Sequence, residues 1–134
     1  MKILVVDDEE VSREKLMLLL SAYGDCDSAE KGEKALEMFK RARSENRPYE
    51  LVTMDVEMPR MSGKEVIAQM REIERIRPEQ RAKILMVTVT ADVRTVLSSF
   101  KIGCDGYIIK PFTEEKVREV LSSCSIRPKP AKQG

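Results

Sequence analysis

Four short apolar runs in this chain are each followed by a polar side chain that can take part in chemistry. The runs are Ile3–Val6, Leu51–Met54, Ile84–Val87 and Tyr107–Ile109. The side chains that follow them are, in the same order, Asp7 with Asp8, then Asp55, Thr88 and Lys110. Any one of these could be an ordinary turn residue that faces solvent. Four run ends with chemically complementary groups are harder to explain in that way, and together they predict one site.

The three aspartates predict a site for a hard cation. Carboxylates brought to one point repel one another and require a positive charge. Oxygen ligands favour Mg2+, which keeps several of its waters and binds phosphate oxygens. An aspartate can also act as a nucleophile and become an aspartyl phosphate. Phosphoryl transfer depends mainly on positioning and charge stabilisation, which Mg2+, the Lys110 ammonium and the Thr88 hydroxyl would supply.

The elements that must position these residues alternate along the chain. The four runs are almost continuously apolar, as in strands buried on both faces of a parallel sheet, and Cys26–Ala29 is a weaker fifth candidate. Apolar residues at helical spacing predict helices over 11–23, 31–44, 63–77, 93–102 and 114–124. Ser62 and Thr113 stand where N-caps belong.

Five strand–helix repeats predict an α/β fold with a parallel sheet and right-handed crossovers. They are too few for an eight-stranded barrel, so we expect a flavodoxin-like (βα)5 doubly wound sheet with strand order 2-1-3-4-5. The first and third strands flank the switch point of that sheet, where ligands bind in open α/β folds. The polar run ends would therefore converge at the carboxyl edge.

Composition narrows the class of protein. The chain has 134 residues, 42% hydrophobic and 35% charged, which favours one domain with a real core. Its net charge of +1 gives no sign of direct nucleic-acid binding or of attraction to a membrane. The apolar runs are too short for a membrane span or a signal peptide, so we expect a cytoplasmic protein. We assign the domain to 1–125, and the Pro- and Lys-rich residues 126–134 to a flexible tail or the start of a linker.

Two other features argue against alternative chemistry. The three cysteines, Cys26, Cys104 and Cys124, are widely spaced and histidine is absent, so the usual zinc and Cys/His nucleophile schemes lack their parts. We expect these thiols to be reduced and mostly buried.

The charged run 71–81 is interpreted as a solvated helix end and loop.

Four motifs together resemble the receiver domains of bacterial response regulators, of the chemotaxis-regulator kind. They are VDDEE at 6–10, MDVEMPRMSG at 54–63, VT at 87–88 and GYIIKPF at 106–112. Each motif is weak alone, but their order and spacing are specific, and the resemblance covers about residues 1–125.

The resemblance implies a role for each site residue. Asp55 would be the phosphoacceptor, and Lys110 would contact the phosphoryl group. Mg2+ would bind Asp8, Asp55 and the backbone carbonyl of Glu57 directly, and Asp7 through water.

The resemblance also implies a switch. Thr88 and Tyr107 would move together, although Tyr107 could instead be a strand aromatic that is half in the core. The Lys110–Pro111 peptide bond is expected to be cis.

Three residues depart from the family's commonest pattern: Glu57 near the phosphoryl group, Val89 after the switch threonine, and Ser62 before Gly63. Glu57 is therefore expected to modulate the lifetime of the phosphorylated state. Thr90 is a second candidate for the switch threonine, but the family spacing to Lys110 favours Thr88, and Thr90 would then influence access of water.

The expected function is a phosphorylation-dependent switch of a two-component system. Its phosphodonor would be a sensor histidine kinase or a phosphotransfer protein, and a downstream protein would bind the face formed by the fourth helix, fifth strand and fifth helix. The chain would catalyse its own phosphorylation and dephosphorylation, without a separate metabolic substrate. A phosphotransfer shuttle, or the receiver of a larger regulator or hybrid kinase, remains open.

Competing functions lack their motifs. A haloacid-dehalogenase-type phosphatase needs DxDxT after the first strand, where this chain reads Asp7-Asp8-Glu9-Glu10-Val11. A dinucleotide enzyme needs GxGxxG there, but the first glycine is Gly24. A degenerate receiver would have lost Asp55, an acidic partner or Lys110.

Overall fold

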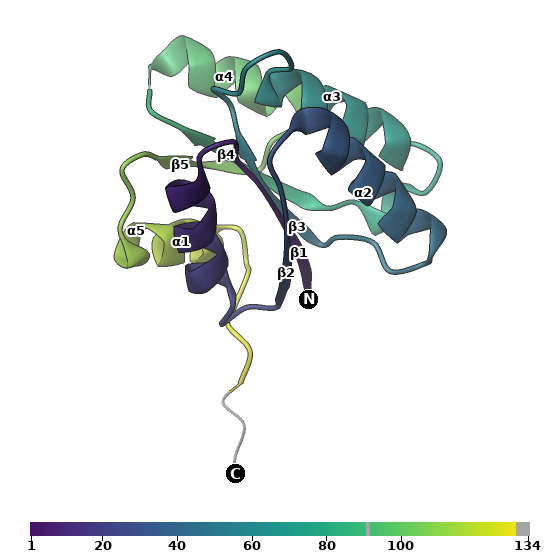
Figure 1. The fold of residues 1–134 in the computed structure, drawn as a ribbon, viewed down its shortest axis with the longest axis horizontal. Coiled ribbons are helices and arrows are strands. Elements are labelled where there is room, and N and C mark those ends of the chain that lie inside the picture. The colour runs from purple at the N-terminus through teal and green to yellow at the C-terminus, as the bar shows by residue number, and fades with distance from the viewer. Residues whose placement is uncertain (91, 131–134) are drawn as a thin grey trace.

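The computed structural model describes residues 1–90 and 92–130, and within them five strands alternate with five helices (Figure 1). The strands are β1 (Lys2–Val6), β2 (Asp25–Ala29), β3 (Leu51–Asp55), β4 (Lys83–Thr88) and β5 (Gly106–Ile109). The helices are α1 (Glu10–Leu20), α2 (Gly32–Ser44), α3 (Gly63–Glu74), α4 (Val93–Ile102) and α5 (Glu114–Ser123), with a 3-10 turn, η1, at Pro78–Gln80. All strand pairs are parallel, in the order β2-β1-β3-β4-β5. The predicted flavodoxin-like fold is confirmed.

The sheet separates two apolar cores. Helices α1 and α5 cover one face, and α2 and α3 cover the other, with α4 beside α3 (Figure 1). Along β1, Ile3 and Val5 point into the first core, whereas Leu4 and Val6 point into the second. This alternation explains the continuous apolar run, because both faces of a central parallel strand are buried.

The ends of two helices differ from their predicted positions. The first was expected over 11–23 but ends at Leu20, and the third was expected over 63–77 but ends at Glu74. In the third, apolar spacing continues to Ile76, yet that side chain is 88% exposed and contributes no burial. The backbone turns away here because Arg77 N–H donates to the carbonyl of Glu74.

The start of α3 is fixed beside the end of β3. The predicted N-cap Ser62 accepts a hydrogen bond from Glu65 N–H, 3.3 Å, and Thr113 caps α5 in the same way. A Cβ atom at Gly63 would lie 2.3 Å from the carbonyl oxygen of Asp55. A glycine is therefore required for this close approach of helix and strand.

The charged run 71–81 was expected to be solvated, and for Arg71 and Glu74 this was wrong. The Arg71 side chain is 15% exposed and donates to the carbonyls of Gly103 and Ala82 and to the carboxylates of Glu74 and Asp105. Glu74 is buried and also accepts from Ala82 N–H, 2.6 Å. This ion network ties α3 to the strand ends at the amino edge of the sheet.

The chain beyond α5 begins packed against the domain. Ile126 is buried in the core beneath α1 and α5, and Lys129 N–H donates to the carbonyl of Ala22, 2.8 Å. The last part of the predicted flexible tail, 131–134, lies outside the described residues. Cys104 and Cys124 are buried, Cys26 is partly buried, and all three are free thiols.

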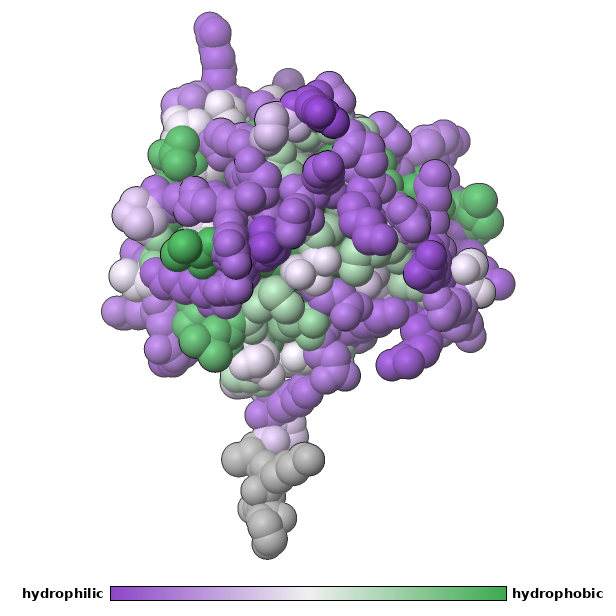
Figure 2. Space-filling view, viewed as in Figure 1, coloured by the Kyte–Doolittle hydropathy of each residue, from purple (hydrophilic) through white to green (hydrophobic). Residues whose placement is uncertain are grey.

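The surface in Figure 2 is mainly hydrophilic, with separate apolar patches, several of them on the side where α1 and α5 lie (left in this view). Among the described residues, no helix combines the length and the apolar character that crossing a bilayer demands.

Candidate functional site

Three carboxylates meet at the carboxyl edge of the sheet. Asp7 and Asp8 follow β1, Asp55 ends β3, and one oxygen from each lies within 4.8 Å of the other two. We call Asp7, Asp8 and Asp55 the acidic cluster. Asp7 and Asp55 are buried, whereas Asp8 is exposed, so the cluster opens to solvent on one side. The predicted convergence of these residues is confirmed.

The Lys110 ammonium faces this cluster from the end of β5. Its Nζ lies 3.1 Å from Asp7 Oδ2 and 3.5 Å from Asp55 Oδ2. The other oxygens accept backbone bonds, because Glu9 N–H donates to Asp7 Oδ1, 2.8 Å, and Glu57 N–H donates to Asp55 Oδ1, 3.0 Å. The Lys110–Pro111 bond is cis, as expected.

The electrostatics of the cluster show an excess of negative charge. Burial raises the pKa of Asp55 to about 8, and the charge of Asp7 and a hydrogen bond with it add to the increase, against the opposing effect of Lys110. Burial lowers the pKa of Lys110, but its bond to Asp7 and the charges of Asp55 and Asp7 outweigh this, and the net pKa is raised. One ammonium does not balance three carboxylates.

The donor set fits Mg2+. It consists of carboxylate oxygens that converge from two adjacent strands, and such oxygens suit a small hard cation. The exposed Asp8 leaves room for the waters that Mg2+ retains. The Glu57 carboxylate is directed elsewhere, toward β4, so the ligand expected from Glu57 remains its backbone carbonyl.

Glu57 makes the contact that the sequence did not reveal. Its Oε1 accepts a hydrogen bond from the Thr88 hydroxyl, 2.6 Å, and a second from Val89 N–H, 3.1 Å. Thr88 is fully buried, at the predicted end of β4, whereas Thr90 lies in the following loop and its N–H donates to Thr88 Oγ1, 3.2 Å. Sequence spacing placed Glu57 near the site but could not give the direction of its side chain.

Thr88 and Tyr107 lie on adjacent strands and on the same face of the sheet. Thr88 pairs with Ile109, and Met86 pairs with Tyr107, so Thr88 and Tyr107 are diagonal neighbours. Tyr107 packs partly against the core under α2 and α3 and lines a hollow of about 600 Å3. Phe100 of α4 and Val120 of α5 line the same hollow.

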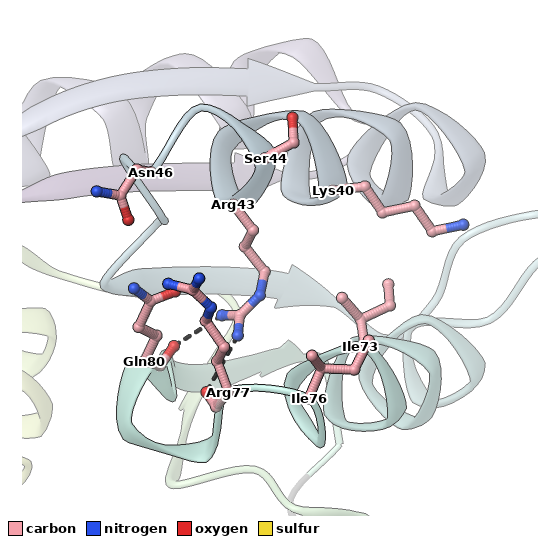
Figure 3. Close-up of a pocket in the computed structure, with 8 residues that line it drawn as sticks. All are labelled: Lys40, Arg43, Ser44, Asn46, Ile73, Ile76, Arg77 and Gln80. Atoms are coloured by element: carbon pink, nitrogen blue, oxygen red, sulfur yellow. Dashed lines mark hydrogen bonds between the residues drawn. The ribbon is translucent and has the colours of Figure 1, made fainter.

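A second hollow, of about 490 Å3, lies between the C-terminal ends of α2 and α3 and η1 (Figure 3). It is lined by Lys40, Arg43, Ser44, Asn46, Ile73, Ile76, Arg77 and Gln80. The Arg43 guanidinium donates to the backbone carbonyls of Gln80, 2.8 Å, and Arg77, 3.2 Å, so it ties the end of α2 to η1. This arrangement is structural, and none of the described residues that line the hollow is acidic.

The match to a known family covers most of the chain. Residues 3–122 match the response regulator receiver domain family. The chain is 34% identical to the chemotaxis protein CheY of Halobacterium salinarum, over 90% of this chain and 93% of that protein. It is 38% identical to the probable transcriptional regulator ycf27 of Porphyridium aerugineum, over 90% of this chain but only 48% of that protein's length.

A solved structure supports the same assignment. The DrrB receiver domain, described as BeF3-activated, is 29% identical, with a TM-score of 0.72, and the match covers 92% of this chain and 93% of that one. Fold, acidic cluster and sequence agree, and the chain belongs to the response regulator receiver domain family.

Proposed function

We propose that this chain is a phosphorylation-dependent signalling switch in which Asp55 accepts a phosphoryl group from a sensor histidine kinase or a phosphotransfer protein. The observation that carries the proposal is the acidic cluster facing Lys110. A purely structural site would balance its buried charges. Here the surplus of negative charge favours binding of a cation, and the carboxylate of Asp55 lies in the same cluster as a potential nucleophile.

The reaction would be an in-line displacement at phosphorus. An Asp55 carboxylate oxygen forms the new P–O bond while the P–N bond of a phosphohistidine breaks, and the leaving imidazole keeps the electron pair and is protonated by solvent. Hydrolysis reverses the activation, because water attacks the phosphorus and inorganic phosphate leaves Asp55. No histidine is needed in the acceptor chain.

Each residue of the site would serve one part of this reaction. Asp7, Asp8, Asp55 and the Glu57 carbonyl would hold Mg2+, which neutralises charge on the phosphoryl oxygens when bound. The Lys110 ammonium, already aimed at Asp55, would pair with another phosphoryl oxygen. The Thr88 hydroxyl would donate to a third.

Output is proposed to pass through α4, β5 and α5. The predicted apolar face of the fourth helix is not covered within the described residues, since Val93, Leu97 and Phe100 are all exposed, as is Ile109 of β5. Tyr107 lines the adjoining hollow, next to Thr88 in the sheet. Phosphorylation would shift a two-state equilibrium here, provided that the phosphoryl group interacts differently with the two states.

Intact-mass measurement tests the proposed function. With Mg2+ and acetyl phosphate, the wild type is expected to gain one phosphoryl group and Asp55→Asn none. Equal labelling of both proteins would contradict the assignment of Asp55.

Backbone NMR with Mg2+ and beryllofluoride, an aspartyl-phosphate mimic, tests the route to the output surface. Shifts are expected in α4, β5 and α5. Changes confined to the loops around Asp8, Asp55 and Lys110 would exclude this route.

A further inference from the structure

We propose that the Glu57 carboxylate competes with the phosphoryl group for the hydrogen-bond donors at the end of β4, and thereby holds Thr88 in its resting position. This inference rests on the proposed function, because the competitor is a phosphoryl group on Asp55. Glu57 would be a positioning residue that sets how readily the switch engages.

Two donors converge on one anionic oxygen of Glu57. The Thr88 hydroxyl lies 2.6 Å from Oε1 and Val89 N–H lies 3.1 Å from it. A hydroxyl and a backbone N–H directed at one point form a concavity that suits an anion. In the resting chain that anion is a carboxylate of the chain itself.

A phosphoryl group on Asp55 would need the same donors. Strands β3 and β4 are adjacent, and Asp55 pairs with Val87, the residue directly before Thr88. Glu57 is tethered at the same place, because its own N–H donates to Asp55 Oδ1. Lys110 approaches Asp55 from the end of β5, so the donors on the β4 side are the Thr88 hydroxyl and Val89 N–H.

The two acceptors differ in how easily they leave. Residue Glu57 is exposed, so its carboxylate has a hydrated position available in solvent. Thr88 is fully buried, and its hydroxyl donates its proton to Glu57. A phosphoryl oxygen would replace one anionic acceptor by another, which avoids leaving a buried donor unpaired. Displacement of Glu57 would also remove a negative charge from the neighbourhood of the phosphoryl group.

Beryllofluoride affinity in the presence of Mg2+ measures this competition, with the dissociation constant taken from NMR titration. Glu57→Ala removes the competing acceptor and its charge but keeps the backbone carbonyl proposed to bind Mg2+. We expect affinity to rise about tenfold, the scale of one charge-assisted hydrogen bond. Glu57→Gln keeps an acceptor without the charge, so its affinity should lie between those of Glu57→Ala and the wild type.

The matched control is Glu33→Gln. Glu33 is an exposed acid in the first turn of α2 and lines a hollow together with Asp8, so it reports the effect of removing a charge near the cluster. Its affinity should change less than about twofold, as expected for an exposed charge.

A second readout examines the resting state without Mg2+ or beryllofluoride. The Val89 amide should lose its hydrogen-bonded proton shift and its protection from exchange in Glu57→Ala, and keep much of both in Glu57→Gln. Tighter binding by Glu57→Ala together with the altered Val89 amide supports the inference. If a folded Glu57→Ala variant binds beryllofluoride no more tightly than the wild type, the inference is wrong. The proposed function still stands in that case, provided that the wild type binds beryllofluoride. A wild type that binds no beryllofluoride contradicts both.

Discussion

Two charge clusters, each with at least one buried carboxylate, lie at opposite edges of the same sheet and compensate that buried charge in different ways. The Arg71 cluster, formed by Arg71, Glu74, Arg81 and Asp105, has two guanidinium groups and two carboxylates. The acidic cluster has three carboxylates and faces one ammonium. One set of charges is balanced by the chain itself, whereas the other leaves a surplus.

This contrast distinguishes a structural charge cluster from a functional one. In the Arg71 cluster, backbone groups use the remaining hydrogen-bonding capacity: Arg71 donates to the carbonyls of Gly103 and Ala82, and Glu74 accepts from Ala82 N–H. In the acidic cluster, burial raises the pKa of Asp55 to about 8, and the charge of Asp7 adds to the increase. Uncompensated negative charge destabilises the folded state, and we expect a bound cation to offset this destabilisation.

The largest effect on stability is expected at the Arg71 cluster. Arg71→Leu would leave the buried Glu74 carboxylate without its cation and should lower the free energy of unfolding by about 3 kcal/mol. Arg75→Leu is the control, because Arg75 pairs with Glu72 at the exposed surface and should cost less than about 1 kcal/mol. Urea denaturation measures both. Equal stability of the two variants would mean that the Arg71 cluster is not structural.

The acidic cluster should make stability depend on pH in the opposite sense from a paired carboxylate. Asp55 has a higher pKa in the folded chain than in the unfolded chain, so the folded state binds more protons between about pH 4 and about pH 8. In EDTA the melting temperature should therefore fall as the pH rises through this range.

Two changes should reduce the decrease in melting temperature with rising pH. Asp55→Asn removes the titrating group, and saturating Mg2+ replaces the proton as the neutralising charge. Thermal melts at a series of pH values measure all three samples. A wild-type melting temperature that rises over the same range in EDTA would show that the cluster is already balanced.

A smaller effect distinguishes the two threonines. Thr88→Ala removes the buried hydroxyl proposed to bind the phosphoryl group, so it should weaken coupling to Tyr107 by about 1 kcal/mol or more. Thr90→Ala removes a hydroxyl in the following loop and should leave switching intact. The measurement is the beryllofluoride-induced NMR shift of Tyr107. If Thr90→Ala loses that shift and Thr88→Ala keeps it, the switch residue is Thr90 and not Thr88.

Much of the fold and site followed from local patterns. Apolar runs end where the central strands β3 and β4 end, because burial on both faces leaves no room for polar residues, so Asp55 and Thr88 were placed correctly at one edge. Lys110 was placed at the same edge by the shorter apolar run of the edge strand β5. Strand β2 was the weakest prediction since it is an edge strand with exposed Asp25, Asp27 and Ser28. The apolar periodicity predicted too long a helix for α3, because periodicity alone does not show that Ile76 faces solvent.

What could not be predicted was the direction of charged side chains. Arg71 belongs to a run of charges that is typical of a solvated helix end, yet its partners Gly103 and Asp105 lie far along the chain. The contact between Glu57 and Thr88 likewise joins the loop after β3 to the end of β4, and its existence depends on the distance between these strands rather than on any local pattern.

Locating the phosphoryl group chemically tests whether Asp55 is the phosphoacceptor. An aspartyl phosphate is a mixed anhydride that borohydride reduces to an alcohol, so a phosphorylated aspartate becomes homoserine. After treatment with acetyl phosphate and Mg2+, peptide mass spectrometry should find homoserine at position 55 alone, and EDTA should abolish it. Conversion at Asp7 or Asp8 instead, or labelling of Asp55 that persists without Mg2+, would contradict the account.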